Sequence, residues 1–185
     1  MIKILRQIFR TGIVTEPLLS EADPGVREAG FELDATVKKR FRGSLTIREV
    51  DAGSCNGCEL EIHAMNNPFY DCERFGMHFT ASPRFADLLL VTGPVSRNME
   101  TALRRTFEAT PSPKLVVACG DCAVNGGIYG GSYAVLGGVD KVIPVDCSIS
   151  GCPPSPDRIL AALLRLTGAA DPLRKPNARN SRQGG

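Results

Sequence analysis

Four short runs of apolar, β-branched residues mark the chain from residue 45 onward. They are Leu45–Val50, Ala86–Thr92, Lys114–Ala118 and Lys141–Val145. Each run is nearly continuous rather than alternating between apolar and polar positions, which is typical of a strand covered on both faces of its sheet. The pattern therefore predicts four buried strands.

Helical stretches are expected between and after these runs. The predicted helices cover Glu59–Asn66, Arg97–Glu108 with Ser96 as the capping residue, and Pro156–Leu166. Strands that alternate with helices form a parallel sheet with right-handed crossovers. The predicted fold is therefore α/β, with a flavodoxin-like parallel sheet flanked by helices.

The first dozen residues follow a helical pattern of their own. Apolar side chains fall on one side and basic side chains on the other, at Ile2, Leu5, Ile8 and Phe9 and at Lys3, Arg6 and Arg10. We interpret them as a short basic amphipathic helix, which packs on its own domain or docks on a partner or a membrane surface. Helix breakers follow, and we expect an extended arm over residues 13–43.

The last fifteen residues, DPLRKPNARNSRQGG, hold almost nothing apolar, so burial cannot offset the entropy lost on ordering them. The sequence thus predicts three parts. Residues 1–43 form the N-terminal helix and arm, residues 44–168 the α/β domain, and residues 169–185 a disordered basic tail.

Composition excludes several classes of protein. The chain has 185 residues, of which 43% are hydrophobic and 23% charged, as in an ordinary globular domain. No apolar run approaches the roughly 20 residues of a transmembrane helix. A net charge of only +2 and the absence of Trp argue against a nucleic-acid-binding protein.

The seven cysteines are the most informative residues in the sequence. Their odd number, in a chain without a recognisable secretory signal, favours metal or redox chemistry in the reducing cytoplasm over a disulfide framework. Cysteine pairs follow the predicted strands as Cys55–Cys58, Cys119–Cys122 and Cys147–Cys152. Because the carboxyl ends of parallel strands meet at one edge of the sheet, these loops should converge. Spacing alone admits a structural zinc site, whereas the flanking Gly and Pro residues favour a bulkier iron–sulfur cluster.

Three stretches carry a resemblance to a known family. They are GSCNGCELEI, GDCAVNGGIYGG and VDCSISGCPPSPDRIL. They resemble the small subunit of nickel–iron hydrogenases and the cluster-bearing B subunit of respiratory NADH–quinone oxidoreductase, over about residues 45–167. The resemblance implies one [4Fe–4S] cluster held by Cys55, Cys58, Cys122 and Cys152. Cys122 is preferred to Cys119 as the third ligand because the family has a Gly two positions before it and a Gly-Gly pair shortly after it.

The first loop favours one branch of this family. Hydrogenase small subunits have Cys-x-x-Cys there, as in this chain, whereas the respiratory B subunit has two adjacent cysteines. We expect no twin-arginine leader and no second set of cluster ligands after Cys152, as in the membrane-bound, energy-converting hydrogenases and formate hydrogenlyase. The resemblance implies a cytoplasmic oxidoreductase subunit, peripheral on the inner membrane. It would relay electrons between a ferredoxin-like iron–sulfur subunit and a nickel–iron large subunit, and its N-terminal helix offers a contact for membrane-arm subunits.

Two alternatives remain open at this point. One is a quinone-reductase-type B subunit with a nickel-free large partner, and the other is a structural zinc-binding scaffold. No catalytic residue is expected on this chain, although Glu61 is a candidate proton relay because an acidic residue recurs near this place in the family. We expect Cys72, Cys119 and Cys147 to be small buried hydrophobes, with a place beside the cluster as the alternative for Cys147.

Overall fold

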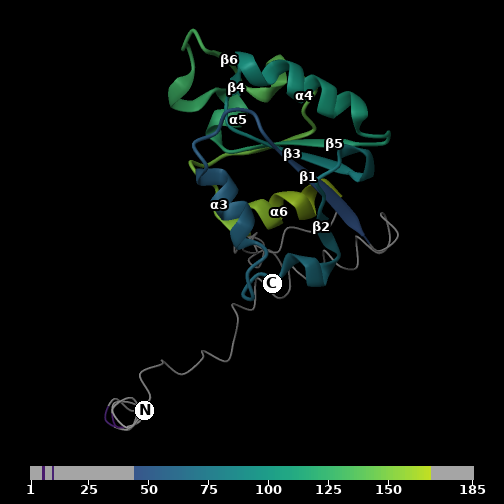
Figure 1. The fold of residues 1–185 in the computed structure, drawn as a ribbon, viewed down its shortest axis with the longest axis vertical. Coiled ribbons are helices and arrows are strands. Elements are labelled where there is room, and N and C mark those ends of the chain that lie inside the picture. The colour runs from purple at the N-terminus through teal and green to yellow at the C-terminus, as the bar shows by residue number, and fades with distance from the viewer. Residues whose placement is uncertain (1–5, 7–9, 11–43, 168–185) are drawn as a thin grey trace, which may run out of the picture.

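The computed structural model describes residues 44–167, together with Arg6 and Arg10. Five parallel strands form one sheet in the order β2-β1-β3-β5-β7 (Figure 1). The strands are β1 (Leu45–Asp51), β2 (Met77–Phe79), β3 (Leu88–Thr92), β5 (Leu115–Cys119) and β7 (Cys147–Ile149). This is the flavodoxin-like strand order, and it reverses direction between β1 and β3. The predicted α/β fold is confirmed.

Helices cover both faces of the sheet (Figure 1). Helices α3 (Gly57–Ala64) and α6 (Pro156–Thr167) lie on one face and α4 (Arg97–Ala109) on the other, while the short α5 (Asp121–Asn125) follows β5. Successive side chains of a strand point to opposite faces. Leu88 and Leu90 accordingly join the core under α3 and α6, whereas Leu89 and Val91 join the core under α4.

Smaller elements that the sequence did not predict complete the domain. A two-stranded antiparallel sheet pairs β4 (Val95–Ser96) with β6 (Val135–Gly137). Four 3-10 turns are η1 (Cys72–Phe75), η2 (Pro83–Phe85), η3 (Gly127–Tyr129) and η4 (Val139–Lys141). Within residues 44–167, no helix has both the length and the apolar character needed to cross a bilayer.

The prediction of a fourth strand at Lys141–Val145 is wrong. Val139–Lys141 is a 3-10 turn, and the last strand of the sheet is Cys147–Ile149. Pro144 has no N–H to donate to a neighbouring strand, so the run cannot pair continuously. Val142 and Ile143 are instead buried in the core under α4. The run is apolar because it packs on a face of the sheet.

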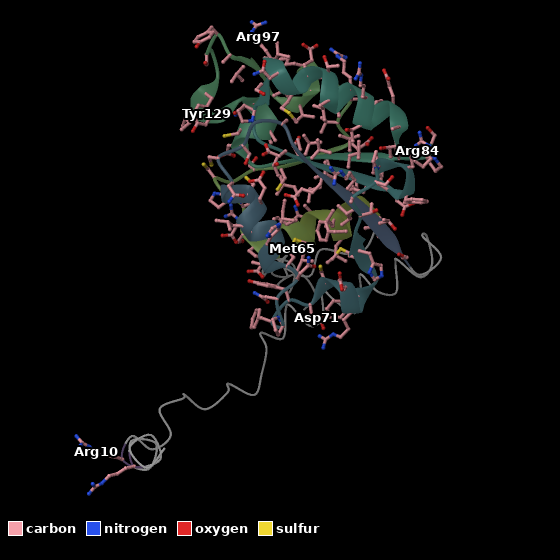
Figure 2. The ribbon with its side chains drawn as sticks, viewed as in Figure 1. Arg10, Met65, Asp71, Arg84, Arg97 and Tyr129 are labelled. Carbon is pink, nitrogen blue, oxygen red and sulfur yellow. The ribbon has the colours of Figure 1, made fainter. Side chains whose placement is uncertain are left out.

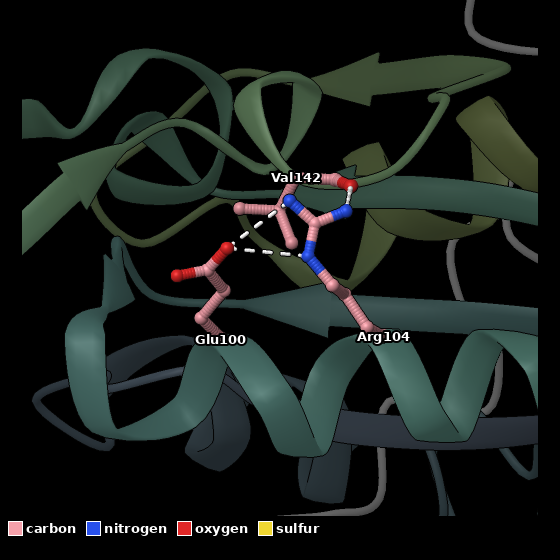
Figure 3. A network of polar contacts seen from close by, with 3 residues as sticks. All are labelled: Glu100, Arg104 and Val142. Carbon is pink, nitrogen blue, oxygen red and sulfur yellow. Dashed lines mark hydrogen bonds and ion pairs between the residues drawn. The ribbon is translucent and has the colours of Figure 1, made fainter.

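The segment Lys141–Val145 is tied to α4 by one arginine (Figure 3). Arg104 donates from Nη1 to the Val142 carbonyl at 2.8 Å. Glu100, one turn earlier in α4, accepts from Arg104 Nη2 at 3.1 Å and from Nε at 3.2 Å. The ion pair holds the guanidinium over the segment that follows η4.

Two other predictions need correction. Ser96 stands at the N-cap position of α4, as predicted, but its side chain makes no capping hydrogen bond. The helix predicted over Glu59–Asn66 begins and ends two residues earlier, at Gly57–Ala64. The predicted N-terminal helix and arm and the basic tail lie outside the described residues, apart from Arg6 and Arg10, which are helical and exposed.

Candidate functional site

Four cysteines from the segments that follow three of the strands line one pocket at the carboxyl edge of the sheet. Cys55 and Cys58 follow β1, Cys122 follows β5, and Cys152 follows β7. The pocket has a volume of about 160 Å³, and Gly93, which follows β3, also lines it. It therefore lies beside the point between β1 and β3 where such sheets bind their ligands. We call this cavity the cysteine pocket.

A short chain of hydrogen bonds shapes the first cysteine loop. Asp51 Oδ1 accepts from the N–H groups of Gly53 and Ser54, both at 2.7 Å. Ser54 Oγ accepts from the Asn56 N–H at 2.9 Å and donates to Glu59 Oε2 at 2.5 Å. These bonds curl the backbone so that Cys55 and Cys58 face the same cavity.

The segments that follow β5 and β7, which carry Cys122 and Cys152, are joined by hydrogen bonds. The Gly120 N–H donates to the Ile149 carbonyl at 2.8 Å, and the Asp121 N–H donates to the Gly151 carbonyl at 2.9 Å. In return, the Gly151 N–H donates to Asp121 Oδ1 at 2.8 Å. Asp121 thus lines the cysteine pocket and is held there by hydrogen bonds to Gly151.

Two glycines leave room for cysteine sulfurs. A Cβ atom added at Gly120 would lie 2.5 Å from Cys58 Sγ, and one added at Gly127 would lie 2.7 Å from Cys122 Sγ. Both distances are shorter than real Cβ contacts. Both glycines also have positive φ, +91° and +52°, where other residues are strained. Any other residue at these positions would displace a thiol that faces the pocket.

The thiols of the site have unequal proton affinities. A hydrogen bond from the Cys119 thiol lowers the pKa of Cys58, and the same contact, together with burial, raises the pKa of Cys119. Burial raises the pKa of Cys122, with a further increase from the neighbouring Cys152. Cys58 is therefore the thiol most easily deprotonated of these three, as a metal ligand must be.

The remaining candidate residues do not line the cysteine pocket. Cys119 has no exposed surface, and Cys147 packs against the core under α3 and α6. Cys72 is also buried, and its thiol donates to Asn66 Oδ1 at 2.8 Å. Glu61 is half-buried on α3 and does not line the pocket.

The four thiols of the cysteine pocket are spread around a cavity and do not meet at the position of a single metal ion. Among residues 44–167, no group of three or more His, Cys, Asp or Glu side chains is gathered closely enough to hold a single metal ion. Cys55 and Cys152 are exposed at the rim, whereas Cys58 and Cys122 are half-buried. The donor set is four soft sulfur ligands, which suits iron–sulfur clusters and zinc.

Sequence reasoning did not identify the roles of Glu59 and Asp121. Glu59 is only 8% exposed, and its Oε1 has no hydrogen-bond partner. The sequence signal for this contact is the spacing between Ser54 and Glu59, because a hydroxyl five residues earlier in a tight loop can reach the Glu59 carboxylate. Asp121 bonds to a residue 30 positions away, which no local pattern indicates.

Comparisons with known proteins agree on one family. The family described as "NADH ubiquinone oxidoreductase, 20 Kd subunit" matches residues 55–166. Formate hydrogenlyase subunit 7 of Escherichia coli is 44% identical over 77% of this chain and 56% of its own length. The B 1 subunit of the NADH-quinone oxidoreductase of Herpetosiphon aurantiacus is 47% identical over 59% of this chain and 61% of its own length. The chain thus spans little more than half the length of these two relatives.

A solved structure is similar to this chain in both sequence and fold. A chain of the membrane-bound sulfane sulfur reductase, an archaeal respiratory membrane complex, is 38% identical to this protein and superposes with a TM-score of 0.61. The match covers 76% of this chain and 74% of the other. These three proteins, among others that match, are named as subunits or chains of oxidoreductase complexes.

Proposed function

We propose that this chain, which belongs to the family of the 20 kDa subunit of NADH–ubiquinone oxidoreductase, carries one [4Fe–4S] cluster on Cys55, Cys58, Cys122 and Cys152. The family is one of electron-transfer subunits in membrane-bound hydrogenase and complex I-like assemblies. In our proposal this chain relays single electrons between a ferredoxin-like subunit and a catalytic large subunit.

The observation that carries the proposal is the convergence on one pocket of four cysteines from the segments that follow β1, β5 and β7. Gly120 and Gly127 supply the space that the sulfurs of Cys58 and Cys122 occupy. Cys₄ ligation is the usual way in which proteins hold such clusters. The residues present therefore fit the group.

The chain's own residues would perform three tasks at this site. The four thiolates would hold the iron, and the bonds between Asp121 and Gly151 would keep two of the ligand loops in register. When bound, a [4Fe–4S] cluster supplies a one-electron couple whose potential depends on hydrogen bonds to its sulfurs and on exposure to solvent. Burial of Cys58 and Cys122 against the sheet would shield their side of the site from water.

A partner would cover the open rim of the cysteine pocket. Apolar side chains are exposed close in sequence to the pocket's cysteines, with Leu60 at 62% on α3, two residues after Cys58, and Ile128 at 84% on η3, six residues after Cys122. Figure 2 shows Tyr129, also on η3, on the side of the domain opposite to Arg84. Exposed apolar groups around a functional cavity favour a protein interface. We assign this face to the large subunit, and we propose that the assembly lies on the cytoplasmic face of the membrane.

The presence or absence of nickel in the large partner subunit distinguishes two branches of the family. The Cys-x-x-Cys pair favours a nickel–iron hydrogenase type, whereas the similarity to a NADH–quinone oxidoreductase chain keeps a nickel-free, quinone-reductase type as the second candidate. A structural zinc scaffold would use the same four thiols and is the alternative from another class.

The test is EPR spectroscopy of the complex purified without oxygen and reduced with dithionite. We expect a reduced-cluster signal that is absent from the Cys55→Ser and Cys152→Ser variants and present in Cys147→Ser, because Cys147 does not line the pocket. Nickel in the copurified large subunit would select the hydrogenase type. A wild-type complex without a reduced-cluster signal would contradict the proposal.

A further inference from the structure

Strand β1 is paired on both sides only near its start. Its pairing with β3 extends over Ile47–Asp51, whereas its pairing with β2 ends where Ile47 lies opposite Phe79. One further bond runs from the Thr80 N–H to the Ile47 carbonyl at 2.9 Å. Because β1 has seven residues and β2 has only three, Arg48–Asp51 form a free edge of the sheet within the described part of the chain.

The backbone groups of Glu49 point outward from this free edge. Successive residues of a strand direct their N–H and C=O groups to opposite sides. The Thr46 carbonyl accepts from the Asp87 N–H at 2.8 Å, and the Ala52 N–H donates to the Thr92 carbonyl at 3.0 Å, so the even-numbered positions bond toward β3. The Glu49 N–H and C=O therefore point past the end of β2, where a free edge offers them to another strand.

A groove lies along this free edge. It has a volume of about 300 Å³, and residues of β1, of α3 and of the end of β2 with the two residues after it line it. They are Arg48, Glu49, Ile62, His63, Asn66, Phe79, Thr80 and Ala81. We call this cavity the edge groove. It shares no lining residue with the cysteine pocket and is a separate feature of the domain.

The edge groove holds two opposite charges that do not pair with each other. Arg48 Nε is buried without a hydrogen-bond partner, and Glu49 is half-buried. The ion pairs found among the described residues include neither side chain. The two lie on opposite faces of the sheet, because Ile47 joins the core under α3 and α6 whereas Val50 joins the core under α4. An occupant that satisfies both must present an acceptor on one face and a cation on the other.

We propose that the edge groove receives an extended segment of a partner subunit, which pairs with β1 at Glu49 and continues the sheet beyond the end of β2. Neighbouring side chains of such a strand reach opposite faces. An acidic residue would face Arg48 and the basic residue next to it would face Glu49, as in opposite-charge pairs between strands. Main-chain bonds to Glu49 would supply affinity, as in other cases of strand addition. The inference goes beyond the proposed function, since it requires a partner subunit but no cluster.

The test is site-specific photo-crosslinking in the complex purified with its partners. The photoreactive residue p-benzoylphenylalanine replaces Ala81, which is exposed and lines the edge groove. The matched control replaces Ala109, an exposed alanine on α4 outside the groove. Mass spectrometry identifies the attached residues. We expect the probe at Ala81, and not the probe at Ala109, to attach to one short partner segment in which an acidic and a basic residue are neighbours.

Side-chain variants test the charge pairing in the edge groove. Arg48→Ala should increase the rate at which the partner subunit dissociates on dilution by about tenfold, because the partner's carboxylate loses its donor. Arg48→Lys keeps the positive charge and should dissociate at a rate closer to wild type. Arg74→Ala is the matched control, since Arg74 is an exposed arginine on η1 outside the groove, and it should behave like wild type.

Other results would overturn the inference. Attachment of the Ala81 probe to residues 1–43 of this chain would assign the edge groove to the chain's own N-terminal segment. No attachment at Ala81, or attachment to a partner segment without the charged pair, would contradict strand addition. A wild-type dissociation rate in Arg48→Ala would contradict the charge pairing. If Arg48→Ala does not assemble, the crosslink still decides, because the probe at Ala81 leaves β1 unchanged.

Discussion

Asp121 and Gly151 are joined by two hydrogen bonds that run in opposite directions. The Gly151 N–H donates to Asp121 Oδ1 at 2.8 Å, and the Asp121 N–H donates to the Gly151 carbonyl at 2.9 Å. Each residue directly precedes a cysteine of the pocket. The pair therefore fixes Cys122 relative to Cys152, and Asp121 has a positioning role that its place in the sequence does not reveal.

Asp121→Ala should weaken the retention of iron. The variant leaves the Gly151 N–H without its acceptor, at a cost of about 1–3 kcal/mol, and frees the loop that carries Cys152. Asp121→Asn keeps an acceptor oxygen and should behave like wild type. The measurement is the rate at which a chelator removes iron from the complex without oxygen, and we expect it to rise several-fold in the alanine variant alone.

Glu61→Ala is the control for this experiment, since Glu61 is an acid on α3 that does not line the pocket. The chelator should remove iron from the Glu61→Ala complex at the wild-type rate. If Asp121→Asn lost iron as fast as Asp121→Ala, the charge of Asp121 rather than its bond to Gly151 would be the important property.

The third cluster ligand can be identified with two serine variants. Cys122 lines the pocket, whereas Cys119 is buried behind it. Cys122→Ser should therefore lose the cluster and the assembled complex, and Cys119→Ser should keep both. Iron content of the purified complexes measures this directly, and the reverse pattern would show that the ligand assignment is wrong.

Gly120→Ala should also abolish iron binding, although it removes no ligand. Its new Cβ would lie 2.5 Å from Cys58 Sγ and would push that sulfur from its place. Gly131→Ala is a matched control, because Gly131 has a similar φ of +89° and nothing within 4 Å of the added atom. Both variants should lose about 1 kcal/mol of stability from backbone strain. Iron content equal in the two variants would contradict the steric argument.

Cys72 should stay unreactive in the folded chain. Burial raises its pKa to about 12, above the usual thiol value of 9.0, so the reactive thiolate is nearly absent at pH 8. We expect mass spectrometry to find Cys72 unmodified after iodoacetamide treatment of the native complex and modified after denaturation. Equal modification in the two states would show that the thiol is accessible.

The raised pKa of Cys72 also makes the free energy of unfolding depend on pH. Because the unfolded chain loses the Cys72 proton first, the contribution to folding stability is complete below about pH 9 and is lost as the pH rises toward 12. Cys72→Ala removes this part of the pH dependence. Denaturant unfolding of the two chains between pH 8 and pH 11 should therefore show a steeper loss for wild type.

The sequence predicted those parts of the fold that local patterns encode. The strands β1, β3 and β5 lie on the apolar runs that predicted them, since each run is covered on both faces. The run Lys141–Val145 has the same appearance but is not a strand, because Pro144 cannot donate a hydrogen bond and the run packs on a face. Strand β2 was missed because its three residues are too few to show a period.

The candidate site was predictable only in part. Cysteines placed after parallel strands indicated that the loops would converge, and the four predicted ligands do line one pocket. The contacts between loops were not predictable. The hydrogen bonds between Asp121 and Gly151 and the space that Gly120 leaves for Cys58 Sγ each depend on residues far apart in the sequence.

The most direct test of the central claim is the iron, acid-labile sulfide and zinc content of this chain, isolated with its partners without oxygen. We expect about four irons and four sulfides per chain and no stoichiometric zinc. One zinc per chain and no sulfide would contradict the proposed cluster, and would leave a flavodoxin-like scaffold with a structural metal site on the same four thiols.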